Sequence, residues 1–136
     1  HNSISLIENC AFSNMKYLKE LNLEYNKLKY FQKDLFFYIG ESNLLYLELN
    51  NNNLEEFYFS ELCFACHEIT LNNNKIKMIL VNNFFSIFRL NLKNNEISNL
   101  NRKSFMIHNL KFLLELNLAY NKIISLEPDF FNNVLE

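Results

Sequence analysis

One five-residue motif in the sequence has the form of a cofactor or metal site. Cys63-Phe64-Ala65-Cys66-His67 matches C-x-x-C-H, in which two thiols attach a haem and the histidine ligates its iron. The same side chains could offer three ligands to zinc, but no fourth ligand lies nearby to complete a tetrahedral site. Haem and zinc are therefore minor alternatives to a structural role, and we expect no cofactor.

The other residues with catalytic potential are scattered along the chain. His108 replaces the apolar residue that most repeats have thirteen residues after the asparagine, and His1 and His67 are far from any acid–nucleophile pair that the repeat would bring together. Glu55-Glu56 is typical of a solvated surface pair. Gly40 is the only glycine, so no glycine-rich loop can cradle a phosphate. The sequence therefore predicts that the chain is not an enzyme.

The composition limits the class of protein. A chain of 136 residues with 49% apolar side chains can bury one continuous core. A net charge of −2 does not favour nucleic acid or anionic lipid as a partner, and no apolar run is long enough for a transmembrane helix. Asparagine occurs 25 times against one glycine and one proline, so asparagine is expected to make the turns.

The asparagines occur at a fixed place in a repeat. Five copies of the pattern L-x-x-L-x-L-x-x-N-x-L, with Ile or Cys at some leucine positions, follow a partial copy at Asn2-Ser3-Ile4. The spacings between successive asparagines, from Asn2 onward, are 24, 26, 22, 21 and 26 residues. The asparagines of the five complete copies are Asn26, Asn52, Asn74, Asn95 and Asn121.

The repeat predicts a coil that can bury its apolar side only against neighbouring coils. The alternating x-L-x-L-x segment is typical of a short strand, and stacked coils would join these strands into one parallel sheet. The asparagine turns the chain after each strand, and its buried amide should bond to backbone groups as one rung of a ladder. Apolar residues recur five residues after each asparagine, and phenylalanines ten residues after most of them, as a spine near the opposite side.

This pattern resembles the typical subfamily of leucine-rich repeats. In animals that subfamily is found mostly in Toll-type receptor ectodomains, in adhesion proteins of the chaoptin and connectin kind, and in secreted immune proteins. The resemblance covers essentially the whole chain and implies an α/β solenoid, a right-handed superhelix of horseshoe form. A short-stranded parallel sheet would line its concave face, and irregular or helical segments its convex face.

The resemblance also sets expectations for the domain and its cysteines. Residues 1–136 should form one domain of five repeats plus a partial N-terminal one, without the cysteine-bearing caps of extracellular members, as in a fragment of a longer chain. Cys66 occupies the first leucine position of the third repeat, which predicts a buried core thiol or a local disulfide. Three cysteines leave the redox compartment undecided.

The outward strand positions provide the predicted binding surface. They form three columns on the concave face, where five acidic residues against two basic ones favour a mildly basic protein partner. Tyr46 and Arg89 are the expected anchors, and the convex Lys33 and Lys103 should matter little. The predicted partner-binding residues are Glu20, Asn22, Glu24, Tyr46, Glu48, Glu68, Thr70, Arg89, Asn91, Lys93, Glu115 and Asn117.

The expected function is a protein–protein interaction module. The leading hypothesis is a ligand-binding or adhesion segment of an extracellular receptor or secreted recognition protein, with a protein ligand or partner subunit, no nucleic acid and no membrane insertion. One alternative is an intracellular scaffold or regulatory subunit. Another is that the face is only a solvated polar surface, with the true site in repeats outside this chain.

Overall fold

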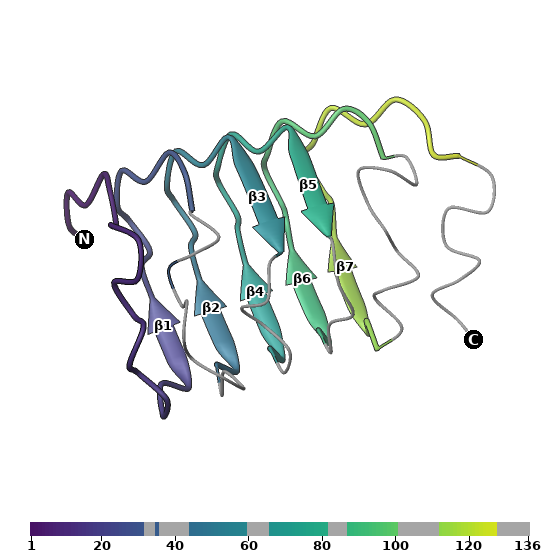
Figure 1. The fold of residues 1–136 in the computed structure, drawn as a ribbon. Helices are drawn as coiled ribbons and strands as arrows, with labels where there is room; N and C mark the ends of the chain where they lie inside the picture. Colours follow the sequence, from purple (N-terminus) through teal and green to yellow (C-terminus); the bar gives the residue numbers. More distant parts are fainter. Residues whose placement is uncertain (32–34, 36–43, 60–65, 82–86, 101–111, 128–136) are drawn as a thin grey trace.

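The computed structural model describes residues 1–31, 35, 44–59, 66–81, 87–100 and 112–127. Five three-residue strands form one parallel sheet in the order β1-β2-β4-β6-β7, as the stacked coils of Figure 1 show. This arrangement is consistent with a leucine-rich repeat solenoid. The strands are β1 (Glu20–Asn22), β2 (Tyr46–Glu48), β4 (Glu68–Thr70), β6 (Arg89–Asn91) and β7 (Glu115–Asn117).

The three inner strands of this sheet, β2, β4 and β6, bury their central residue, whereas the central residues of the end strands β1 and β7 are only partly buried. Leu47, Ile69 and Leu90 are paired across β2, β4 and β6, and each is at most 1% exposed. The period-two alternation of strand side chains explains this pattern, because only the leucine position of the repeat points into the stack. The sheet therefore presents an apolar inner surface and a polar outer surface.

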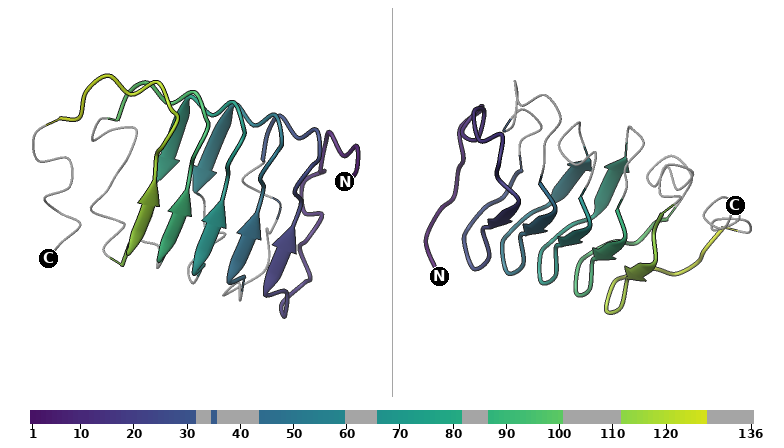
Figure 2. Two further views of the ribbon diagram at one scale, coloured as in Figure 1. Left: turned by 180° about the vertical axis from the view of Figure 1, so that it is seen from behind. Right: turned by 90° about the horizontal axis from the view of Figure 1, so that it is seen from below.

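The opposite side of the coils corrects one expectation. Strands β3 (Glu56–Phe59) and β5 (Met78–Val81) pair in parallel as a second sheet where irregular or helical segments were expected, and the described residues contain no helix. Figure 2 shows the two rows of arrows on opposite sides of the stack. Phe57 and Ile79 are buried at the recurring apolar position five residues after the asparagine, and aromatic and β-branched residues favour strands.

The repeated asparagines lie at the turns that follow the first sheet, and Asn26, Asn52, Asn74 and Asn95 are buried there. The Asn74 side chain donates through Nδ2 to the carbonyl oxygens of Leu49 and Leu71, each at 3.0 Å. Its Oδ1 accepts a hydrogen bond of 3.0 Å from the backbone N–H of Leu54. Asn52, Asn95 and Asn121 repeat this pattern, so each amide joins two neighbouring coils.

The residue before each ladder asparagine has left-handed backbone geometry, with φ between 55° and 57°. None of these residues is glycine. Left-handed geometry costs roughly 1–2 kcal/mol for a residue with a side chain, and asparagine is among the residues that tolerate it best. The sequence supplies asparagine in three repeats and tyrosine in two. These residues are Tyr25, Asn51, Asn73, Asn94 and Tyr120.

The core between the sheets is continuous and contains Cys66. This residue is fully buried and disulfide-bonded, with its partner outside the described residues, whereas Cys10 is a free cysteine. Of the predicted phenylalanine spine only Phe12 is described, and it packs partly buried against the core. No helix in the described part of the chain is long and apolar enough to cross a bilayer.

Candidate functional site

The strand pairing shows which outward residues lie side by side. Each strand is in register with the next, so corresponding positions of successive repeats form straight columns. We use the name sheet face for the outer side of the five-stranded sheet, where these columns lie. The first column is Glu20, Tyr46, Glu68, Arg89 and Glu115, and the second is Asn22, Glu48, Thr70, Asn91 and Asn117.

A hydrogen-bond network ties the first repeats of the sheet face together. Asn22 donates through Nδ2 to Glu48, and Asn50 donates both to Glu24 and, at 2.8 Å, to the Thr70 hydroxyl. The Asn50 Oδ1 atom accepts a bond of 2.7 Å from the backbone N–H of Asn72. These contacts link residues of three repeats and hold the carboxylates in place, which lowers the entropic cost of binding a partner.

Three predicted binding asparagines also have a structural role. The Oδ1 atoms of Asn22, Asn91 and Asn117 each accept a hydrogen bond, at 3.0, 3.2 and 3.0 Å, from the backbone N–H two residues later. Such side-chain to backbone bonds stabilise the bend at which a strand ends. These amides therefore shape the end of the strand in addition to facing solvent.

Four glutamates gather at the β1 and β2 end of the sheet face. The pKa of Glu48 is raised above its usual 4.5, first by partial burial and then by the negative charges of Glu24, Glu20 and Glu68. Each charge contributes because like charges disfavour further ionisation nearby. The neighbouring carboxylates create a local negative potential that an incoming cation would relieve.

Arg89 lies between two carboxylates of the first column. Its guanidinium nitrogens are 3.9 Å from Glu68 Oε2 and 3.5 Å from Glu115 Oε2. All three side chains are solvent-accessible, so these ion pairs contribute little to stability. The two ion pairs neutralise part of the negative charge of the first column near β6. To bind a partner molecule, Arg89 would have to release both glutamates, a cost that the sequence did not reveal.

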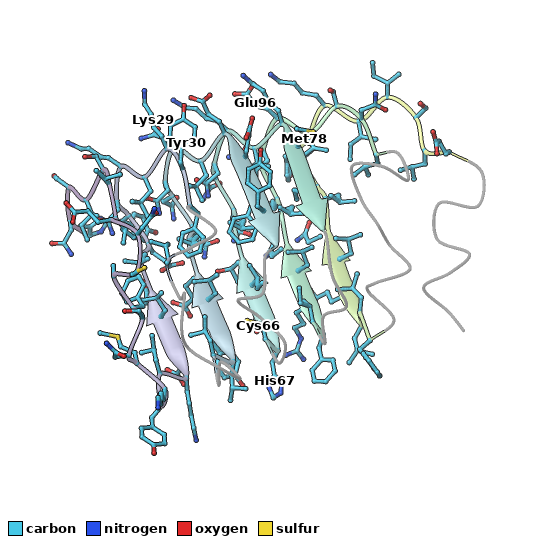
Figure 3. All side chains as sticks on the ribbon, viewed as in Figure 1. Lys29, Tyr30, Cys66, His67, Met78 and Glu96 are labelled. Carbon is cyan, nitrogen blue, oxygen red and sulfur yellow. The ribbon has the colours of Figure 1, made fainter. Side chains whose placement is uncertain are left out.

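An aromatic cluster lies where the strands begin, and the sequence predictions did not include it. His67 stacks on Phe88 with ring centroids 5.1 Å apart, and it meets the Tyr46 ring edge-on at 6.1 Å. Figure 3 labels His67 and Cys66 at this end of the strands. The sequence contained one indication of this cluster. The position after the first leucine of the repeat is Leu45, His67, Phe88 and Leu114 in four successive repeats.

The third column continues past the strands toward the asparagine turns, and its residues are Glu24, Asn50, Asn72, Lys93 and Ala119. Glu24 is tied to Asn50, whereas Lys93 places its ammonium 5.2 Å from the ring centroid of Tyr120. The buried Oδ1 atom of Asn72 has no hydrogen-bond partner. The acidic residues of the sheet face thus gather toward β1 and β2, and its two basic residues, Arg89 and Lys93, belong to the β6 repeat.

Of the remaining candidates from the sequence, the C-x-x-C-H motif and His108, the structure describes only Cys66 and His67. The Cys66 sulfur is disulfide-bonded and fully buried, so it agrees with the local-disulfide alternative and has no thiol for attaching a haem. Its neighbour His67 turns to the aromatic cluster. Cys63, His108 and the two lysines that the sequence predicts on the convex face, Lys33 and Lys103, lie outside the described residues.

Comparison with known proteins gives relatives of one kind, although no family model matches the chain. The chain is 32% identical over 130 residues to osteomodulin of Rattus norvegicus, covering 93% of this chain and 30% of the relative. The identity to osteomodulin of Bos taurus is also 32%, over 93% of this chain and 31% of that protein. The chain thus spans less than a third of the length of the curated relatives it matches. Osteomodulins are secreted proteins of the extracellular matrix, which confirms the predicted extracellular location and shows similarity to an extracellular leucine-rich repeat group.

Proposed function

We propose that this chain is a binding segment of a secreted matrix protein and that its sheet face docks a basic protein. The observation that carries the proposal is the gathering of Glu20, Glu24, Glu48 and Glu68 at one end of the sheet face. Partial burial raises the pKa of Glu48 most, and the three neighbouring negative charges raise it further. A partner that brings lysine or arginine side chains would lower that potential, and complementary charge favours both encounter and register.

The relatives narrow the class of parent protein. Osteomodulins belong to the small leucine-rich proteoglycans, so similarity to them favours a matrix protein over a receptor ectodomain, a cell-adhesion receptor or an innate-immunity protein. The same relatives offer no support for the intracellular scaffold considered from sequence. They are also not enzymes, which supports a role in binding for this segment.

Tyr46 is the proposed anchor of the docked partner. It lies 37% exposed in the acidic column, between the glutamates of β1 and β4 and beside the His67 ring. A tyrosine offers large contact area with a polar tip and few rotatable bonds, which is why it is enriched among binding hot spots. The aliphatic part of a lysine or arginine side chain of the partner would pack on the Tyr46 ring, while its charged end reaches the neighbouring glutamates.

Affinity for a short lysine-rich peptide, measured by fluorescence anisotropy on the whole chain, tests the proposal. The double variant Glu48→Gln and Glu68→Gln should bind more weakly than the control Glu8→Gln and Glu127→Gln, which removes the same two charges far from the sheet face. Tyr46→Ala should weaken binding more than Tyr30→Ala, a tyrosine that is 60% exposed at the other side. Equal losses in test and control variants would overturn the proposal, because net charge alone would then explain binding.

A further inference from the structure

The asparagine turns form a second surface, which shares no residue with the first two columns of the sheet face. A shallow depression of about 440 Å³, open to solvent, follows these turns across four repeats. Its volume falls in the range of roughly 300–1,000 Å³ that small-ligand sites occupy. The lining residues are Asn52, Asn73, Asn74, Lys75, Asn94, Asn95, Glu96, Tyr120, Asn121 and Lys122.

The depression has a positive local charge. Lys75, Glu96 and Lys122 occupy the same position in successive repeats, directly after the ladder asparagine. The Lys122 ammonium donates to Glu96 Oε2 at 2.9 Å. The pKa of Glu96 is lowered first by this hydrogen bond and then by the charges of Lys122, Lys77 and Lys75. An ammonium has three donors, so Lys122 can keep Glu96 and still bind an anion.

An exposed row of amides crosses the same depression. Asn73 donates through Nδ2 to Asn51 Oδ1, and Asn94 donates to Asn73 Oδ1, both at 2.8 Å. The next repeat has Tyr120 at this position, so the row ends there and Asn94 Oδ1 accepts no hydrogen bond among the described residues. The row thus leaves an amide acceptor at Asn94 beside the tyrosine ring.

Tyr120 supplies an aromatic surface at this end of the depression. It is 75% exposed, with the Lys93 ammonium 5.2 Å from its ring centroid. Its backbone is held in the left-handed region at φ 57°, a geometry that disfavours tyrosine. No contact among the described residues buries the ring, so packing does not explain why an aromatic residue replaces asparagine here.

From this combination we infer that the turn depression binds an anionic oligosaccharide, such as a sulfated or carboxylated glycan chain. A sugar ring packs on Tyr120, and its hydroxyl groups bond to the amides of Asn73 and Asn94. Its sulfate or carboxylate groups pair with Lys75 and Lys122 through charge-assisted hydrogen bonds. The open shape of the depression suits an extended chain that continues across several repeats.

The test is isothermal titration calorimetry of the chain with a heparin-derived hexasaccharide, with neutral maltohexaose and with a glutamate-rich peptide as comparison ligands. The hexasaccharide should bind, and its affinity should fall as salt is raised, because exposed charge contacts are screened. Maltohexaose should bind much more weakly. Absence of hexasaccharide binding, or a glutamate-rich peptide that binds equally well, would overturn the assignment of a glycan site.

Two variants locate the binding within the depression. Lys75→Ser should weaken hexasaccharide binding by about twofold to fivefold, as expected for one exposed charge contact. Lys19→Ser, which removes a lysine directly before β1 and outside the depression, should leave the binding unchanged. Tyr120→Asn should weaken it by about threefold to tenfold while keeping the turn, since asparagine occupies the same place in three other repeats. Equal effects of Lys75→Ser and Lys19→Ser, or no effect of Tyr120→Asn, would contradict the proposed site.

Discussion

The Oδ1 atom of Asn95 accepts a hydrogen bond of 3.0 Å from the backbone N–H of Ile76, which belongs to the preceding repeat. The same side chain donates to the carbonyl oxygens of Leu71 and Leu92, at 2.9 and 3.0 Å. One amide thus satisfies backbone groups of two coils at a buried turn. A broken rung would leave several polar groups buried without partners, which is costly.

Removing one rung of the ladder should therefore destabilise the fold. Asn74→Ala and Asn95→Ala are each expected to lower the free energy of unfolding by about 1–3 kcal/mol. Asn53→Ala is the control, because this side chain follows a ladder asparagine and makes no hydrogen bond among the described residues. It should change stability by less than about 0.5 kcal/mol. Urea unfolding followed by circular dichroism compares the three variants, and equal losses would refute the role of the ladder.

The sheet core should be sensitive to cavities. Leu71 is completely buried between the two sheets, so Leu71→Ala should lower the free energy of unfolding by about 2–5 kcal/mol. The same substitution at Leu114, which is 81% exposed, removes equal volume without leaving a cavity and should have little effect. Thermal melts that do not separate the two variants would show that the register of the repeat is misassigned.

The left-handed turn position offers a stabilising substitution. Tyr120→Asn replaces a residue that disfavours φ 57° by the one found in three other repeats, and it should raise the free energy of unfolding by about 0.5–1 kcal/mol. A substitution expected to act in the opposite direction is Asn73→Val. It introduces a β-branched side chain at φ 56° and should lower the free energy of unfolding by about 1–2 kcal/mol. Chemical denaturation measures both, and a stabilised Asn73→Val variant would contradict the backbone argument.

The strength of the sequence prediction differs between the two sides of the coil. The spacing around Leu47 and Asn52 repeats in every copy, so strand register and the position of the buried amides follow from alignment of the chain with itself. The second sheet was not predicted, because the apolar position at Phe57 and Ile79 recurs only once per repeat, without the double leucine that marks the first sheet. Strands β3 and β5 form because neighbouring coils pair with each other, and the sequence of one segment alone does not show this pairing.

Part of the predicted binding surface also follows from the sequence, and part does not. The columns containing Glu48 and Glu68 follow from register alone, since strand residues alternate between faces. The ion pairs of Arg89 and the stacking of His67 depend on side-chain reach across repeats, which spacing does not reveal. Tyr120 was not among the residues singled out from the sequence, and its exposure became evident from the structure.

The pKa of Glu48 leads to a pH-dependent stability. Its folded-state pKa is raised above 4.5, so the folded chain holds the proton more tightly than the unfolded chain. Ionised Glu48 therefore destabilises the fold. This destabilisation is absent below about pH 4.5, grows as the pH rises through the raised pKa, and is complete above it. Glu48→Gln should therefore stabilise the fold near pH 7 and make little difference near pH 4. Urea titrations at both pH values check this, and a variant that is less stable at pH 7 would contradict it.

The most direct test of the proposed function is to map where a basic ligand contacts the chain. Two-dimensional ¹H–¹⁵N spectra recorded during titration with the lysine-rich peptide report on every assigned backbone amide. The account predicts that the largest shifts cluster at β1, β2 and β4, around Glu48 and Tyr46, and spread less to β7. Shifts that cluster at the second sheet, around Phe57 and Ile79, would contradict the claim that the sheet face is the docking surface.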